Sequence, residues 1–355
     1  MGDSEELKAS AGTDGWDLPR KLVASLGPLP ANFTTCIRTV KLAEMRMENK
    51  DSSALTTLAF RQVQPVVHLS PTLKSVFYFA AHQLRERDLD ALPNLDELSL
   101  LKLFSADELL AALSLALITR KVRRICDEEQ WKRLFGHLRV HMELGYSVGA
   151  TVVHVGGANG MLVAALRYLS MAMLMVKDLE KFKAYRRETI KKEALFDLAS
   201  ERKLFGCDHL QIASLLLQNL GYGSLIGEGM FASSQVPAGR FGEWLREQDE
   251  VIQCWCAAIL WTESLHATGK ISDDLKGNDD LYLPDETIVD LQSLARVLRD
   301  KGSSWDWPLK GKKDLPEAIQ EKLGVATGQS AGAPEHDSFD AEVGSAVSSP
   351  LAPAE

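Results

Sequence analysis

Residues 201–222 read ERKLFGCDHLQIASLLLQNLGY and carry the strongest local signal of structure in the chain. Asp208 is followed three residues later by Gln211, the spacing at which two polar side chains satisfy the free N–H groups at the start of a helix. The apolar run that follows ends at Gly221, a residue type that commonly terminates helices in the left-handed conformation. The stretch therefore predicts an apolar helix over 209–220 after a charged turn.

Helical signals of the same kind extend in both directions. No run alternates apolar and polar residues over a length that favours a sheet. Ser70 before Pro71, and Ser105 three residues before Glu108, are typical helix starts, and a helix that begins near residue 53 should end before Pro65. The sequence therefore predicts an all-α fold, with further helices over 22–26, 31–47, 53–64, 72–84, 98–125, 131–153, 161–176, 178–200, 241–266 and 286–301.

The composition is that of a globular chain with a sizeable core. The 355 residues are 45% hydrophobic and carry a net charge of −9, which gives the whole chain no attraction to nucleic acid or to an anionic bilayer. We therefore expect no nucleic-acid partner. The five cysteines are scattered without a Cys-x-x-Cys pair, and residues 1–17 lack the apolar core of a signal peptide. These features predict reduced thiols, no metal knuckle and a cytoplasmic location.

One segment could be mistaken for a membrane span. Residues 152–176 are strongly apolar, but glycines interrupt the segment up to Gly160, and only 161–176 remain as a continuous apolar helix. This length falls short of the roughly 20 residues that a bilayer requires. Arg167 also lies near its middle. The segment is therefore predicted to be a buried core helix, with no membrane insertion.

The composition changes near the C-terminus. After Lys322 the chain is rich in Gly, Ala, Ser and Pro and has five acidic side chains with no Lys or Arg, so it cannot bury enough apolar surface to offset its ordering entropy. Trp244, Trp255 and Trp261 are predicted to form the core of an appended helical layer. We predict four regions: a flexible N-terminus (1–17), a main helical domain (18–235), a C-terminal helical extension (236–305) and a largely disordered acidic tail (306–355).

Gly145 to Gly149 match the Gly-x-Ser-x-Gly pattern of the nucleophile elbow of serine hydrolases, with Ser147 as the candidate nucleophile. An elbow follows a buried strand, but charged and polar residues at every second position, Arg139 to Glu143, interrupt the preceding run. The segment beginning at His154, which resembles an oxyanion-hole loop, follows the serine instead of preceding it. A serine hydrolase therefore remains the less favoured alternative.

Basic residues gather between Lys181 and Lys192, interleaved with or flanked by Glu180, Glu188 and Glu193. This pattern is typical of an exposed helix face with local charge pairing. A contact with a protein or with the phosphate of a nucleotide is the alternative interpretation.

The 201–222 stretch resembles the late signature of HDOD domains, in which a charged turn leads through a Gly-x-Asp-His cap into an apolar helix. Trp131 and His137 are placed like the tryptophan and histidine of that family, and residues 160–166 resemble the apolar helix that follows them. The resemblance spans roughly residues 28–231. It implies an HD-domain-like multi-helical bundle with an N-terminal helical subdomain and appended C-terminal helices.

The HDOD family is related to the HD phosphohydrolases, which bind catalytic metals through a His-Asp doublet. The resemblance puts Arg167 and Tyr168 at the place of this doublet, and arginine only donates hydrogen bonds, so it cannot ligate a cation. The one His-Asp pair, His336-Asp337, lies in the predicted tail. The resemblance therefore implies no catalytic residues, no metal and no cofactor.

Two hypotheses follow from the resemblance. The first is a non-catalytic regulatory module of bacterial signal transduction, which acts through protein partners or a small ligand and is not an enzyme. The second is a degenerate metal-dependent phosphohydrolase with a relocated metal site. The same five side chains are the candidates for a ligand or partner pocket in the first case and for metal ligands in the second: His137, His141, His154, Asp208 and His209.

Overall fold

The computed structural model describes residues 15–47, 52–237, 239–275, 281 and 283–325, and within them it contains helices and no strand. The all-α prediction is confirmed. The α-helices are α1 (Asp17–Ala24), α2 (Ala31–Arg46), α3 (Ser52–His68), α4 (Pro71–Leu84), α5 (Glu86–Asp90), α6 (Glu97–Leu101), α7 (Ala106–Ile125), α8 (Glu128–Thr151), α9 (Gly157–Lys177), α10 (Leu179–Lys191), α11 (Leu198–Phe205), α12 (His209–Leu220), α13 (Leu225–Ser233), α14 (Phe241–Leu245), α15 (Glu250–Thr268), α16 (Asp285–Lys301) and α17 (Glu317–Lys322), and the short 3-10 helices are η1 (Asp273–Leu275), η2 (Trp307–Leu309) and η3 (Lys312–Asp314).

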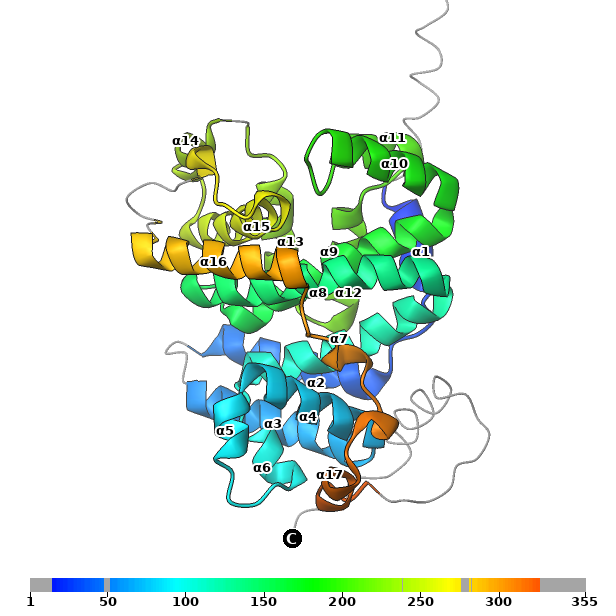
Figure 1. Cartoon of the computed structure of the whole chain (residues 1–355), viewed down its shortest axis with the longest axis vertical. Coiled ribbons are helices and arrows are strands. Elements are labelled where there is room, and N and C mark those ends of the chain that lie inside the picture. The colour runs from blue at the N-terminus through cyan, green and yellow to red at the C-terminus, as the bar shows by residue number, and fades with distance from the viewer. Residues whose placement is uncertain (1–14, 48–51, 238, 276–280, 282, 326–355) are drawn as a thin grey trace, which may run out of the picture.

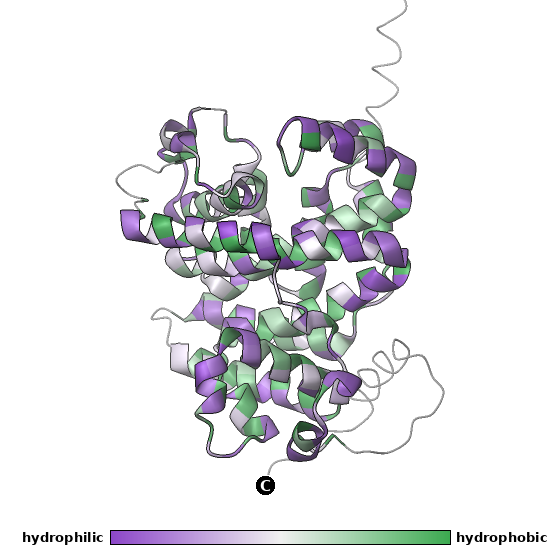
Figure 2. Cartoon of the chain, viewed as in Figure 1, coloured by the Kyte–Doolittle hydropathy of each residue, from purple (hydrophilic) through white to green (hydrophobic). Residues whose placement is uncertain are grey.

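The helices form a lower group and two upper lobes around a central layer (Figure 1). Helices α2 to α6 gather in the lower half, and α8 crosses the middle of the view. Helices α10 and α11 form one upper lobe, and α14 to α16 form the other. The outer helix α10 is largely hydrophilic in Figure 2, as expected for a helix that covers the bundle with one face.

The polar caps read from the sequence are present. Ser105 and Glu108 form a reciprocal capping box at the start of α7, and Asp208 and Gln211 form another at the start of α12. Gly221 ends α12 in the left-handed conformation, with φ 105°. These local interactions explain why the boundaries of α7 and α12 can be read from the sequence alone.

Four predicted helices differ from the structure. The first, predicted over 22–26, is α1 and begins five residues earlier, at Asp17. Helix α3 continues through Pro65 to His68 because burial of Val66 and Val67 in the extra turn offsets the hydrogen bond that proline cannot make. The helix predicted over 178–200 is two helices, α10 and α11, since Asp197 caps a new start. The helix predicted over 241–266 likewise splits into α14 and α15.

Helices α8 and α9 approach each other closely at glycines. A Cβ added to Gly145 would lie 2.6 Å from the backbone oxygen of Gly160, and one added to Gly149 would lie 2.6 Å from the oxygen of Gly156. Ser147 lies between these glycines inside α8, and its hydroxyl donates to the Glu143 backbone oxygen at 3.1 Å. The Gly-x-Ser-x-Gly pattern is therefore part of a helix–helix contact, and the strand–turn–helix geometry of a nucleophile elbow is absent from this segment.

Helix α9 lies at the centre of the bundle. Among the described residues it alone has the length and apolar composition to cross a membrane, and 94% of its most apolar window is buried inside the protein. Its buried positions run from Ala158 to Met175. The chain folds around α9 as a core helix. The glycines that interrupt the apolar segment up to Gly160 belong to the start of this helix, with Gly156 at φ 76° as its N-cap.

The C-terminal helices pack on this centre. Helix α15 contacts α8, α9 and α13, and α16 contacts α8 and α15. Trp255 and Trp261 are buried, as predicted for a helical layer that joins the core, whereas Trp244 is only partly buried. Residues 306–325, predicted as the first part of the tail, are instead structured. Trp307 is fully buried and begins η2, which packs against α4 and α7. Residues 326–355, including His336 and Asp337, lie outside the described residues.

The glycine contact between α8 and α9 can be tested by adding single methyl groups. Gly145→Ala should lower the free energy of unfolding by about 1–3 kcal/mol, because the new Cβ has no room beside Gly160 and Ala164. Gly136→Ala on the same helix is the matched control, since nothing lies within 4 Å of its Cβ. Here the better helix propensity of alanine should leave stability unchanged or raise it by up to about 1 kcal/mol. Urea denaturation of both variants measures the difference, and equal effects would contradict the close contact.

Candidate functional site

Arg167 lies in the interior, on the middle of α9, and only 4% of its surface is exposed. Its Nε–H donates to Nε2 of His209 at 3.2 Å, and its Nη2 forms an ion pair with Glu263 of α15. The guanidinium also lies over the ring of Phe196, 4.3 Å from the centroid. The place that the resemblance assigns to a metal-binding doublet therefore holds a fixed cation between helices α9, α12 and α15.

His209 is held from its other side by Glu201. The Glu201 carboxylate accepts from the backbone N–H of His209 at 2.9 Å and lies 2.8 Å from ring Nδ1, while the Tyr185 hydroxyl donates to it at 2.6 Å. Because the Arg167 Nε–H can only donate, Nε2 of His209 accepts and its ring proton lies on Nδ1, facing Glu201. Burial alone would raise the pKa of Glu201, but its contacts with His209 and Tyr185 outweigh burial and lower it.

Together these contacts form a chain of polar groups, which we call the ionic chain: Tyr185, Glu201, His209, Arg167 and Glu263. All of them are buried except Glu263, which is partly exposed. The ionic chain joins α10, α11, α12, α9 and α15. The positive charge of Arg167 is paired with the Glu263 carboxylate within the chain, as a buried charge requires.

Three histidines surround Tyr168 beside the ionic chain. His137 and His141 lie one turn apart on α8, and Nδ1 of His141 lies 3.0 Å from Nδ1 of His266 on α15. The Tyr168 ring stacks on His137 and on His266, with centroids 6.2 Å and 5.7 Å apart. We call these four side chains the ring cluster.

The histidines of the ring cluster are neutral at physiological pH. Burial lowers the pKa of His137, and the nearby Arg186 lowers it further. Burial and His266 lower the pKa of His141, and burial and His137 lower that of His266 to about 3. At the buried His141 and His266 a protonated imidazole would lie unsolvated beside other cationic groups, so the neutral form is strongly favoured there, whereas His137 is exposed at the surface.

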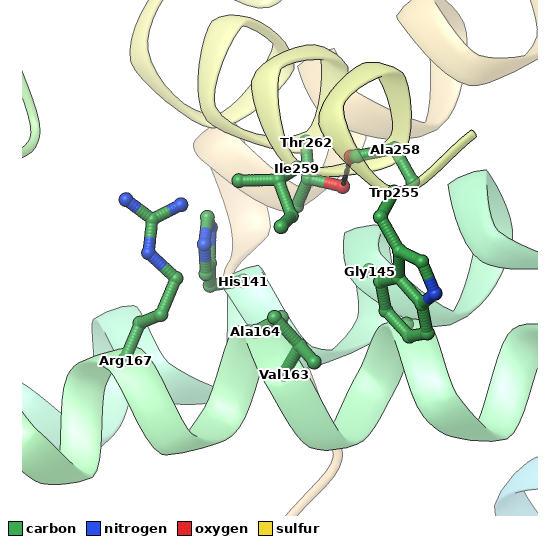
Figure 3. Close-up of a pocket in the computed structure, with 10 residues that line it drawn as sticks. His141, Gly145, Val163, Ala164, Arg167, Trp255, Ala258, Ile259 and Thr262 are labelled. Atoms are coloured by element: carbon green, nitrogen blue, oxygen red, sulfur yellow. Dashed lines mark hydrogen bonds between the residues drawn. The ribbon is translucent and has the colours of Figure 1, made fainter. Parts of the chain in front are cut away.

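A small cavity separates the ionic chain from the glycine contact (Figure 3). Its volume is about 10 Å³, about the space of one water molecule. Figure 3 shows Arg167 and His141 side by side at one end, with Trp255 at the other end and Thr262 of α15 above. Nη1 of Arg167 has no hydrogen-bond partner among the described residues. The interior here is packed, with no open cleft at the arginine.

The structure brings together most of the predicted site residues. His137, His141, Arg167, Tyr168 and His209 all belong to the ring cluster or to the ionic chain.

Two predicted site residues lie apart from this arrangement. Asp208 is buried, but its carboxylate caps α12 and accepts from Arg202 at 2.6 Å, so it does not face the ring cluster. His154 follows the end of α8, with its backbone at φ 67°, and its Nε2 lies 3.4 Å from Oε1 of Glu250. Neither side chain can therefore join the metal set proposed from the sequence.

Sequence reasoning missed several members of the site. Glu201 lies within the 201–222 stretch, eight residues before His209. This closeness in sequence is the signal by which Glu201 could have been predicted as a site residue. The other missed members come from segments far from Arg167 in sequence or from loops without a motif, so their local patterns contain no signal. They are Glu263, His266, Tyr185 and Phe196.

The donors present do not fit a divalent metal. The described residues contain no group of three or more His, Cys, Asp or Glu side chains arranged to hold an ion. The Arg167 guanidinium already lies between His209 and Glu263, where it would repel a second cation.

Comparison with protein-family models, with curated proteins and with solved structures gave no match. The HDOD resemblance therefore rests on the residues quoted from the sequence and stays a prediction.

Removal of the Arg167 charge should destabilise the fold, because Glu263 and His209 lose their buried partner. We expect Arg167→Met to lower the free energy of unfolding by about 3 kcal/mol, the size typical of a broken buried ion pair. The double variant Arg167→Met/Glu263→Met should recover part of this loss, since the unpaired carboxylate is then also removed. Urea denaturation of the wild type, both single variants and the double variant measures the coupling, and strictly additive losses would contradict the ion pair.

Acid should destabilise the protein through the ring cluster. The folded-state pKa of His266 is lowered to about 3 from an ordinary 6.5, so the unfolded chain binds a proton that the folded chain does not. Its contribution is present above pH 6.5 and is lost as pH falls toward 3. Between pH 6.5 and pH 5 this loss is up to about 2 kcal/mol. His266→Phe should flatten this pH dependence, whereas His82→Gln, at an exposed position, should leave it unchanged in urea unfolding.

Proposed function

We propose that this chain is a non-catalytic regulatory module of the HDOD type, which acts in cytoplasmic signal transduction through contacts with a protein partner or a small ligand. The observation that carries the proposal is the buried Arg167, which donates to His209 and pairs with Glu263. The resemblance implies that related phosphohydrolases hold a metal-binding doublet at this place. An arginine there supplies a permanent positive charge but no metal ligand.

The electrostatics of the interior support the same proposal. The Arg167 guanidinium is already paired with the Glu263 carboxylate, and its fixed positive charge repels a second cation. The imidazoles of the ring cluster are of the type that binds metals, but the Nδ1 atoms of His141 and His266 already contact each other.

The absence of room at the arginine also supports a non-catalytic role. The cavity at Arg167 has a volume of about 10 Å³, which accepts a water molecule but not a phosphoryl group. The guanidinium is covered by Glu263 of α15, which pairs with it, and by the ring of Phe196, so a phosphodiester that reached it would have to displace these contacts.

Metal analysis combined with turnover assays tests the proposal. Protein purified without chelators should contain no transition metal at stoichiometric level. With added Mg²⁺, Mn²⁺ or Zn²⁺ it should hydrolyse bis(p-nitrophenyl) phosphate and cyclic dinucleotides no faster than its His137→Ala and His209→Ala variants do. A bound metal or a turnover that disappears in these variants would establish a relocated metal site instead. Labelling by a fluorophosphonate probe that is lost in Ser147→Ala would establish a serine hydrolase.

A further inference from the structure

A groove of about 440 Å³ lies between α8, α9 and α10, on the outer side of the ring cluster. Its volume falls in the range typical of pockets for small molecules. Its walls are mainly apolar and flexible, with Met171, Met175 and Phe182 among them. The groove lies next to the site described above but is distinct from the small cavity at Arg167, because the two share no lining residue.

The floor of the groove consists of flat rings. His137 and Tyr168 stack with an angle of 10° between their planes, and the ring of Phe196 lies 5.4 Å from that of Tyr168. Aromatic faces of this kind favour a flat ligand that can stack or pack edge-on against them.

One group on this floor lacks a hydrogen bond. The Tyr168 hydroxyl is buried and has no partner among the described residues. Burial raises its pKa, so the hydroxyl stays protonated and can donate. A buried donor without a partner costs free energy. Less than 1 Å² of this oxygen is exposed, so a ligand atom that accepts from it must first move groove side chains aside, and the hydrogen bond then removes this cost.

The rim of the groove is cationic. Arg133, Lys183, Arg186 and Arg187 line it, and no acidic side chain does, although Arg133 and Lys183 also pair with glutamates outside the groove. Arg186 is fixed in place because it donates to the backbone oxygen of Leu195 at 2.9 Å. The rim therefore attracts an anion by charge complementarity.

We infer that this groove binds one small molecule that has a flat aromatic body and an anionic group. The rings of His137, Tyr168 and Phe196 contact the body, the Tyr168 hydroxyl donates to an acceptor atom on it, and the cationic rim binds the phosphate or carboxylate. This inference rests on the proposed regulatory function and gives its ligand a chemical class. A fatty acid fits less well, because an alkyl chain over the floor leaves the Tyr168 donor unpaired.

Titration calorimetry with two aromatic anions tests the inference. Guanosine monophosphate represents a phosphate source, and indole-3-acetate represents a carboxylate source. At least one should bind with one-to-one stoichiometry, and Tyr168→Phe should weaken it by about threefold to tenfold, the worth of one hydrogen bond. The same variant should be at least as stable as the wild type in urea, because it removes a buried hydroxyl that makes no hydrogen bond within the described protein. This stability separates a lost ligand contact from a folding defect.

Two lysines on α10 give a matched test of the rim. Lys183 lines the groove and pairs with Glu180 at 2.7 Å, whereas Lys191 lies outside it and pairs with Glu188 at 2.8 Å. Lys183→Gln should weaken binding by about threefold at low salt, and Lys191→Gln should leave it unchanged.

Three results would overturn the inference: no binding of either aromatic anion, binding that Tyr168→Phe leaves unaltered, or tighter binding of decanoate that is insensitive to Tyr168→Phe. Each of them leaves the proposed lack of catalysis untouched, since that is measured by metal content and turnover. Conversely, hydrolysis of guanosine monophosphate with retained dependence on Tyr168 would refute the non-catalytic proposal and keep the ligand site.

Discussion

The close crossing of α8 and α9 is the constraint on which the rest of the structure depends. Gly145, Gly149 and Gly160 let the two backbones touch, and any side chain there would push the helices apart. The crossing sets the distance between the histidines of α8 and the arginine of α9. It thereby brings His141 beside Arg167 and allows α15 to pack across both helices.

The ionic chain depends on that crossing and in turn ties the upper lobes to the centre. Arg167 contacts α12 through His209 and α15 through Glu263, so one buried cation joins segments that are far apart in sequence. Breaking a paired buried charge is costly, whereas replacing the whole pair by apolar groups is often neutral. The stability of the interior is therefore sensitive to the loss of one partner. The positive charge of Arg167 also disfavours the entry of a second cation.

Phe196 connects the ionic chain with the groove. Its ring packs against the guanidinium of Arg167 and against His209 on one side, and it lines the groove beside Tyr168 on the other. A molecule bound in the groove would contact rings that also pack on the buried charges. This shared wall gives a physical route by which occupancy of the groove can bear on the packing of α10, α11 and α15, as the proposed regulatory function requires.

The elements that can be predicted from the amino-acid sequence are those whose signals are local. Capping pairs at Ser105 and Asp208 and the terminating Gly221 predicted α7 and α12, and the apolar run of α9 predicted a buried core helix. The resemblance found in the sequence also indicated that His137, Arg167 and His209 belong to the candidate site. Only the tertiary structure decided that Arg167 pairs with Glu263, that His266 completes the ring cluster and that the glycines around Ser147 serve a helix contact. These outcomes depend on side chains far apart in sequence, whose proximity arises from packing and leaves no periodic pattern along the chain.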